Sequence, residues 1–261
     1  MNSLRIFFIG GAIAYRALFN WLTPWIFVPT FLVAPIFQIL LFVYIGRSAG
    51  VQSDEFYVIG NALQYAAIPC IFAMSSTITD ERQQQTLGFI LVTPARRLPL
   101  FLGRSLPVIV NGMFVSAFAF VVGGAIVGIE VPTSAIGPLA LTIAVSAASC
   151  TGLGLLSAAI GLRVRETATL NNIVFGTLLV FCGTNVALDE LPSWMSFISQ
   201  GLPLTHGIEA ARRLADGAAL STVSGLIGAE ALVGAAYGLL GYGLLRFMEW
   251  QGRRLATLET A

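Results

Sequence analysis

Few side chains in this sequence could carry out chemistry. His206 is the only histidine, so one chain cannot build a catalytic triad or a metal site with two histidines. The chain contains no lysine and no GxxxxGK[ST] motif, which excludes nucleotide binding by a phosphate loop of that kind. The cysteines lie inside hydrophobic runs without a CxxC or Cys/His grouping, and we expect small apolar packing residues rather than a metal or redox site. They are Cys70, Cys150 and Cys182.

Glu230 is the one acidic residue well inside a predicted membrane span. A charge at the bilayer centre costs about 2.5–3.5 kcal/mol on insertion scales, so this side chain should face protein or water, form a pair, or be protonated. One interpretation is proton or ion coupling in a channel or secondary carrier. The other is that Glu230 lies close enough to the outer surface to reach water there. No pair of catalytic groups recurs at membrane depth, which disfavours an intramembrane enzyme.

The composition predicts an integral membrane protein. Hydrophobic residues make up 56% and charged residues 10% of the 261 positions, against about 25% charged in soluble proteins. A bilayer core of about 30 Å needs about 20 helical residues, and six segments meet this requirement: 24–46, 56–78, 104–128, 135–162, 168–187 and 222–245. We therefore expect a single all-α polytopic domain over residues 1–261. Neither a basic patch for nucleic acid nor a repeat of fixed period is visible.

Several features refine this topology. Residues 1–23 mix apolar residues with Arg, Tyr, Asn and Trp, which predicts an amphipathic helix in the membrane interface and not a cleaved signal peptide. If the N-terminus is cytoplasmic, all of the 14 arginines lie on the inner side except Arg47, Arg212 and Arg213. Both termini would then be cytoplasmic. Prolines inside the spans predict kinks or local breaks: Pro29, Pro35, Pro69 and Pro107.

A polar island at 79–102 separates the second and third spans. Thr79 could cap a helix over residues 80–92, Asp80 and Glu81 suit its N-terminal end, and Pro94 would end it. Its apolar stripe and its free polar face indicate a surface helix that could press against another protein.

The loop at 188–221 is the other informative connection. Gly201 and Pro203 divide it into two amphipathic pieces too short to span, which predicts a helical hairpin dipping into the outer leaflet. Glu209 has the spacing for a local pair with Arg212 or with Arg213.

Small and amide residues indicate close helix packing. GxxxG occurs at Gly124 and Gly128 and again at Gly234 and Gly238, which favours packing within the chain, with a dimer seam as the alternative. For the amides in or near spans we expect hydrogen bonds between helices, with cavity lining as the alternative. They are Asn61, Gln64, Asn111, Asn171, Asn172 and Asn185.

The two loops together resemble one family. TDERQQQTLGFILVTPARRLPLFLGRSL, with Glu81-Arg82, Thr86-Leu87 and Thr93-Pro94, and LPSWMSFISQGLPLTHGIEAARRL, before the last span, are similar to signatures in the membrane subunits of type-2 ABC exporters. The six-span pattern extends the resemblance over essentially the whole chain.

The resemblance implies a function, partners and sites. The chain would be the permease subunit of an ATP-driven exporter for amphiphilic substrates such as drugs, natural products, lipids or lipid-linked glycans, in the bacterial cell membrane, with a context closer to the drug-resistance branch. It would hold no cofactor, because ATP and Mg²⁺ would bind two separate ATP-binding subunits, and a second membrane subunit, a copy or a paralogue, would complete the assembly.

Segment 79–98 would carry the coupling helix, 1–23 the connecting helix and 188–221 the outer re-entrant hairpin. Docking residues implied by position are Asp80, Glu81, Arg82, Gln85, Thr93, Pro94 and Arg96. Candidate pathway residues are Tyr65, Phe72, Asn172, Phe175 and Glu230. An ion-coupled carrier or channel using Glu230 is the alternative.

Overall fold

The protein is described by a computed structural model that covers residues 8–13, 23–83, 97–162, 164 and 166–255. Every regular element in this part of the chain is helical, as expected for an all-α protein. Residues 8–13 are helical. The further elements are α2 (Pro24–Phe27), η1 (Val28–Val33), α3 (Ala34–Ala49), α4 (Asp54–Gln64), α5 (Ala67–Gln83), α7 (Arg97–Val127), η2 (Thr133–Ala135), α8 (Ile136–Gly161), α9 (Thr167–Phe181), α10 (Ser193–Ser199), α11 (Thr205–Ala215) and α12 (Leu220–Leu255).

Five helical segments are long and apolar enough to cross a membrane. They are Trp25–Ala49, Asp54–Ser76, Leu102–Val127, Thr133–Gly161 and Leu220–Met248, which confirms five of the six predicted spans. The remaining predicted span, 168–187, is wrong in extent because α9 has 15 residues and ends at Phe181. Gly183 follows with φ of 73°, a left-handed conformation that ends a helix. At 1.5 Å per residue α9 is about 23 Å long, shorter than a bilayer core.

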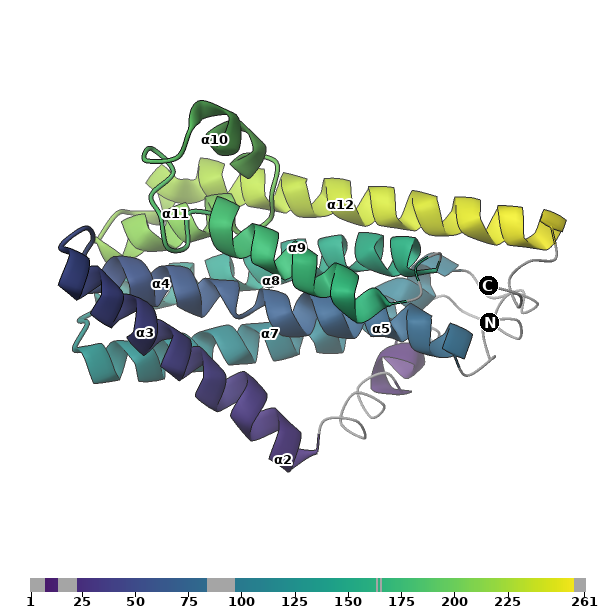
Figure 1. The fold of residues 1–261 in the computed structure, drawn as a ribbon, viewed down its shortest axis with the longest axis horizontal. Coiled ribbons are helices and arrows are strands. Elements are labelled where there is room, and N and C mark those ends of the chain that lie inside the picture. Colours follow the sequence, from purple (N-terminus) through teal and green to yellow (C-terminus); the bar gives the residue numbers. More distant parts are fainter. Residues whose placement is uncertain (1–7, 14–22, 84–96, 163, 165, 256–261) are drawn as a thin grey trace.

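The helices form an elongated bundle (Figure 1). α4 and α5 continue one another along its length beside α7 and α8, α12 runs along one side, and α3 crosses the bundle obliquely. The main hydrophobic core consists of buried residues from α4, α5, α7, α8, α9, α11 and α12, together with residues directly next to the ends of these helices. Cys70, Cys150 and Cys182 are buried in this core with free thiols, which confirms their expected packing role.

The prolines act locally in different ways. Pro29 lies within η1, a π-helical stretch, and Pro35 lies in the first turn of α3, where its missing N–H costs least. The second span is interrupted at residues 65 and 66, between α4 and α5, just before Pro69. This break confirms the expectation for Pro69, since proline cannot donate to the carbonyl one turn earlier. Pro107 lies inside α7, which continues past it.

Glycines bring α8 and α12 into backbone contact. A Cβ atom built on Gly234 of α12 would lie 2.6 Å from the Cα of Ser149, and one on Gly152 of α8 would lie 2.5 Å from the carbonyl oxygen of Gly234. This confirms packing within the chain for the second GxxxG motif. The first motif packs differently, because Gly124 and Gly128 have no close neighbour and Gly128 ends α7 with φ of 87°.

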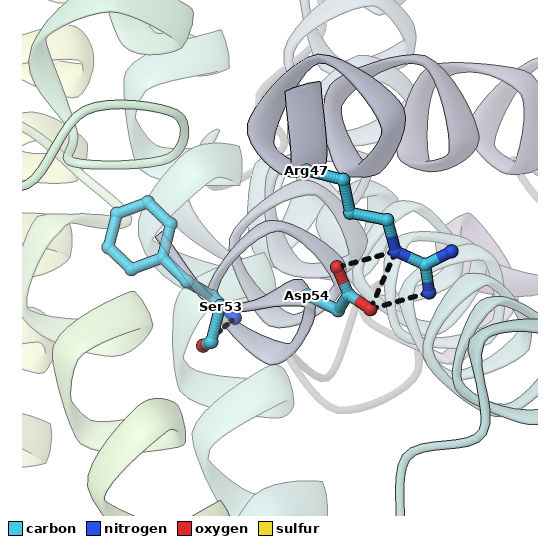
Figure 2. A network of polar contacts seen from close by, with 4 residues as sticks. Arg47, Ser53 and Asp54 are labelled. Atoms are coloured by element: carbon cyan, nitrogen blue, oxygen red, sulfur yellow. Dashed lines mark hydrogen bonds and ion pairs between the residues drawn. The ribbon is translucent and has the colours of Figure 1, made fainter. Parts of the chain in front are cut away.

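Polar side chains order the turn between α3 and α4 (Figure 2). The hydroxyl of Ser53 caps α4 by accepting a hydrogen bond from the backbone N–H of Phe56 at 3.3 Å. Arg47, in the last turn of α3, donates from Nη2 to Asp54 Oδ2 at 2.6 Å and from Nε to both carboxylate oxygens at 3.0 Å. This bidentate pair joins the end of one helix to the start of the next.

Candidate functional site

The predicted docking segment begins at the end of α5. α5 continues without interruption to Gln83, so Thr79 does not cap a separate helix and none begins at residue 80. Between Pro69 and Gln83 the sequence contains no glycine or proline that would end α5. Asp80, Glu81 and Arg82 therefore lie in the last turns of α5. The remaining docking residues lie outside the described residues: Gln85, Thr93, Pro94 and Arg96.

The two regions that the sequence singles out lie at opposite ends of the bundle. The C-terminal ends of α5 and α12 point toward the right in Figure 1, while the α3–α4 turn and the helices α10 and α11 lie toward the left. α12 extends from the hairpin end to beyond the end of α5. It connects the two regions physically.

Two of the candidate pathway residues lie on adjacent helices. Phe72 on α5 and Phe175 on α9 are half-buried, and both pack against the main core. α5 and α9 are in contact with one another. Asn172 lies on the exposed part of α9, beside Ile173, which is 63% exposed. α9 thus has one face in the core and one uncovered face that carries an amide.

The other two pathway candidates lie elsewhere. Tyr65, at the break between α4 and α5, is buried in a small cluster with Phe31 and Val115. It therefore faces η1 and α7 and not α9. Glu230 lies on α12, against the start of α11.

An amide network joins several elements near the hairpin end of the bundle. Gln38 Nε2 donates to Asn61 Oδ1 at 2.8 Å, and Asn61 Nδ2 donates both to Asn185 Oδ1 at 2.9 Å and to the carbonyl of Tyr57 at 2.8 Å. The network joins α3, α4 and the segment after α9, as expected for Asn61 and Asn185. Sequence reasoning missed Gln38, although a lone amide within an apolar span is the same signal.

Three further amides are buried without matching partners. Gln64 has no hydrogen-bond partner at either side-chain atom among the described residues, and the same holds for Asn111 Nδ2 and Asn171 Oδ1. The expected hydrogen bonds are therefore not found for these atoms. Buried polar atoms of this kind are costly.

Glu230 is fully buried and bonded to backbone. Its exposure is 0%, so the interpretation in which it reaches water at the outer surface is wrong. Oε1 accepts a hydrogen bond from the N–H of Leu204 at 2.8 Å, and Oε2 accepts one from the N–H of Gly207 at 3.2 Å. Both donors belong to the start of α11, so the carboxylate caps that helix from a neighbouring span.

Arg212 and Arg213 have separate partners. Arg213 Nε pairs with Glu209 at 2.8 Å on the exposed face of α11. Of the two partners that the spacing offered Glu209, the structure therefore shows Arg213. Arg212 instead donates from Nη2 to the carbonyls of Phe56 at 3.1 Å and Thr184 at 3.2 Å. Its guanidinium carbon lies 3.5 Å from the centroid of the Phe56 ring. Burial lowers the pKa of Arg212 to about 10, and Glu209 opposes this change.

The hairpin consists of two short helices, α10 and α11, joined at residues 200–204, where the sequence predicted them. Their depth in a bilayer stays a prediction.

The chain matches one protein family: the family model of the ABC-2 type transporter matches residues 11–214.

The chain belongs to the ABC-2 type transporter family. The match covers the elements from residue 11 to α11, including the hairpin. No curated protein matches the sequence. The residues of this ABC-2 permease form the membrane-embedded transport subunit and contain no ATPase domain, and ABC-2 permeases pair with ATP-binding subunits.

The three arginines at the hairpin end of the ABC-2 permease are all held by the protein. Arg47 pairs with Asp54, Arg213 pairs with Glu209, and Arg212 bonds to two carbonyls. These are the three exceptions to the predicted arginine asymmetry. Since two of them are neutralised by local carboxylates and the third is largely buried, they add little free positive charge to this end.

Proposed function

We propose that this ABC-2 permease forms the transmembrane pathway of an ATP-driven exporter for amphiphilic small molecules. The observation that carries the proposal is the family match over residues 11–214. The match includes both loops in which the sequence resembles type-2 exporters. The compact loops and the arginines after Thr93-Pro94 support the drug-resistance branch over the polysaccharide branch.

The uncovered face of α9 supports a pathway along α5 and α9. An exposed amide such as Asn172 is unfavourable against lipid tails but suits a polar or protein-covered surface. A second membrane subunit, most simply another copy of this chain, would cover this face, and substrate would pass between the two subunits.

The ATP-binding subunit would dock at the end of the bundle opposite the hairpin. Residues 80–96 would carry the contacts to an ATP-binding subunit, with Glu81 and Arg82 at the end of α5, and ATP and Mg²⁺ would bind that partner. Two such partners would serve two membrane subunits. This end would face the cytoplasm of a bacterial cell, with both chain termini on the same side, as the arginine asymmetry indicates.

The structure gives no support to the alternative of an ion-coupled carrier or channel that uses Glu230. That alternative needs Glu230 to exchange ions or protons with water, whereas its carboxylate is fully buried and both of its oxygens accept backbone hydrogen bonds.

Co-expression with an ABC ATP-binding protein from the same genome tests the proposal. We expect a tag on this chain to co-purify that protein, and ATPase activity in lipid to respond to amphiphilic compounds. The double variant Glu81→Ala with Arg82→Ala should weaken both effects while the protein still inserts. The matched control is Glu209→Ala with Arg213→Ala, which removes the same charge types at the other end and should change neither. A chain that purifies without an ATPase, or a docking variant that behaves as wild type, would refute the proposal.

A further inference from the structure

The two helices of the hairpin are attached to the molecule very differently. α11 buries six of its residues, namely Thr205, Gly207, Ile208, Ala210, Ala211 and Leu214. α10 buries one, Ser199, and leaves Trp194 60%, Phe197 82% and Ile198 44% exposed. Figure 1 shows α10 standing out from the bundle beside the embedded α11.

A buried carboxylate holds the N-terminal end of α11. The first N–H groups of any helix lack partners within it and carry partial positive charge. Here Glu230 accepts from Leu204 and Gly207, which lie 26 and 23 positions away in sequence. Each partner lowers the cost of burying the other, because the carboxylate needs donors in an apolar core and the start of the helix needs an acceptor. Leu204 is fully buried with φ of 75°, so tertiary contacts impose a conformation that leucine rarely adopts.

A buried guanidinium holds the other end of α11. Arg212, in the last turn, bonds to Phe56 at the start of α4 and to Thr184 after α9, and it stacks on the Phe56 ring. A cation near the C-terminal end also complements the helix dipole. The fit is close, since a Cβ on Gly60 would lie 2.8 Å from Arg212 Nη2.

The helices to which α11 is attached are themselves tightly packed. Glu230 lies one turn before Gly234, where the backbones of α8 and α12 touch. A Cβ on Gly207 would collide with Ser146 Oγ on α8, so α11 also approaches α8 closely. α8, α11 and α12 therefore form one packed unit.

α10 depends on fewer contacts. Ser199 Oγ donates to the carbonyl of Phe181 at 2.6 Å, and Trp194 meets the Phe181 ring edge to face at 6.1 Å between centroids. Both contacts reach the end of α9 and neither reaches α12. Gly201 separates α10 from α11.

We propose that Glu230 and Arg212 are positioning residues that fix α11 as part of the transmembrane bundle, so that α10 alone is the movable half of the outer hairpin. Its role as the closure of an export pathway rests on the proposed function. The division of the hairpin into a fixed and a movable helix does not.

Hydrogen exchange of the wild-type protein in lipid nanodiscs, resolved to single residues and measured without any ATP-binding partner, gives the first test. We expect the amides of Leu204, Gly207 and the α11 core to exchange at least about tenfold more slowly than those of α10. Equal protection of the two helices would overturn the proposal. Dependence of the protection at 204–208 on sodium would also overturn it, because Glu230 would then be an ion site.

Glu230→Gln gives the second test. A carboxamide keeps one acceptor oxygen and turns its NH₂ toward the other backbone donor, so exchange at 204–208 should rise about tenfold, the equivalent of one charge-assisted hydrogen bond. Glu209→Gln is the matched control, since it makes the same change on the exposed face of α11 and should leave these amides unchanged. Unchanged exchange in Glu230→Gln would overturn the proposal.

Arg212→Met tests the other anchor, and it keeps the proposal testable if Glu230→Gln fails to insert. Exchange should rise about tenfold at residues 209–215, while the adjacent Arg213→Met should have no effect. Equal exchange in these two variants would refute the role of Arg212. Because none of these measurements requires transport, failure of the anchors and failure of the exporter function are distinguishable.

Discussion

The seam between α8 and α12 allows a quantitative test of the packing. In Gly234→Ala the new methyl carbon would start 2.6 Å from Ser149 Cα, 2.9 Å from its Cβ and 3.0 Å from its Oγ. Carbon atoms in contact prefer about 3.5–4.0 Å, so the helices would have to separate by about 1 Å. The nearest atom belongs to backbone, and no side-chain rotation relieves the clash. Overpacking of this kind costs about 1–3 kcal/mol.

The same substitution also has a favourable part that must be subtracted. Alanine is a better helix former than glycine by about 0.8–1.0 kcal/mol. Gly243→Ala on the same helix gains this term without a clash, because nothing lies within 4 Å of the Cβ position at Gly243. The difference between the two variants therefore isolates the cost of the seam.

Thermal unfolding in one detergent, at a fixed scan rate, measures this difference. One kcal/mol corresponds to about 2–4 °C for a chain of this size, so Gly234→Ala should unfold about 2–12 °C below Gly243→Ala. If the two variants unfold at the same temperature, the backbone contact between α8 and α12 does not exist as described.

Other side chains give further tests by the same assay. Arg212→Lys keeps the charge but loses the planar donor geometry and ring stacking, so it should destabilise by about 1–3 kcal/mol, while Arg213→Lys should stay within about 0.5 kcal/mol of wild type; equal effects would contradict the assignment. Asn61→Leu should cost about 1–3 kcal/mol because it leaves the Asn185 amide without its donor, and the loss should shrink when Asn185→Leu is added; additive losses would exclude the bond. Ser53→Ala should cost about 1 kcal/mol through loss of the α4 cap, with Ser53→Thr close to wild type.

The sequence predicted the long helices well because length and hydropathy alone decide them. Five spans and both hairpin helices appear where the apolar runs and the Gly201 and Pro203 breaks indicated. The predicted span 168–187 failed because its apolar run continues past Phe181, while the helix does not. The left-handed turn at Gly183 and the bonds of Thr184 and Asn185 to distant helices end it there.

The predicted cap at Thr79 failed because no helix starts there. Ser53 follows a turn and caps α4, whereas Thr79 has the same chemistry but lies inside α5. A Thr followed by acidic residues predicts an N-terminus only after the preceding helix has ended.

The roles of the buried charges could not be read from the sequence. Local spacing offered Glu209 both Arg212 and Arg213, and only the fold shows that Arg212 reaches residues 28 and 156 positions away. Glu230 was conspicuous as a lone carboxylate, but its donors lie on another element. Pairings of this kind depend on tertiary structure.

The burial of all three thiols has a practical consequence for biophysical work on this protein. Cys70, Cys150 and Cys182 each have an exposed fraction of 0%, so a thiol-reactive dye or spin label should find no native target while the fold is intact. A single cysteine introduced on α10 would be the only reactive thiol among the described residues. Distances from such a probe could then be followed by fluorescence or electron resonance without first replacing residues of the main core.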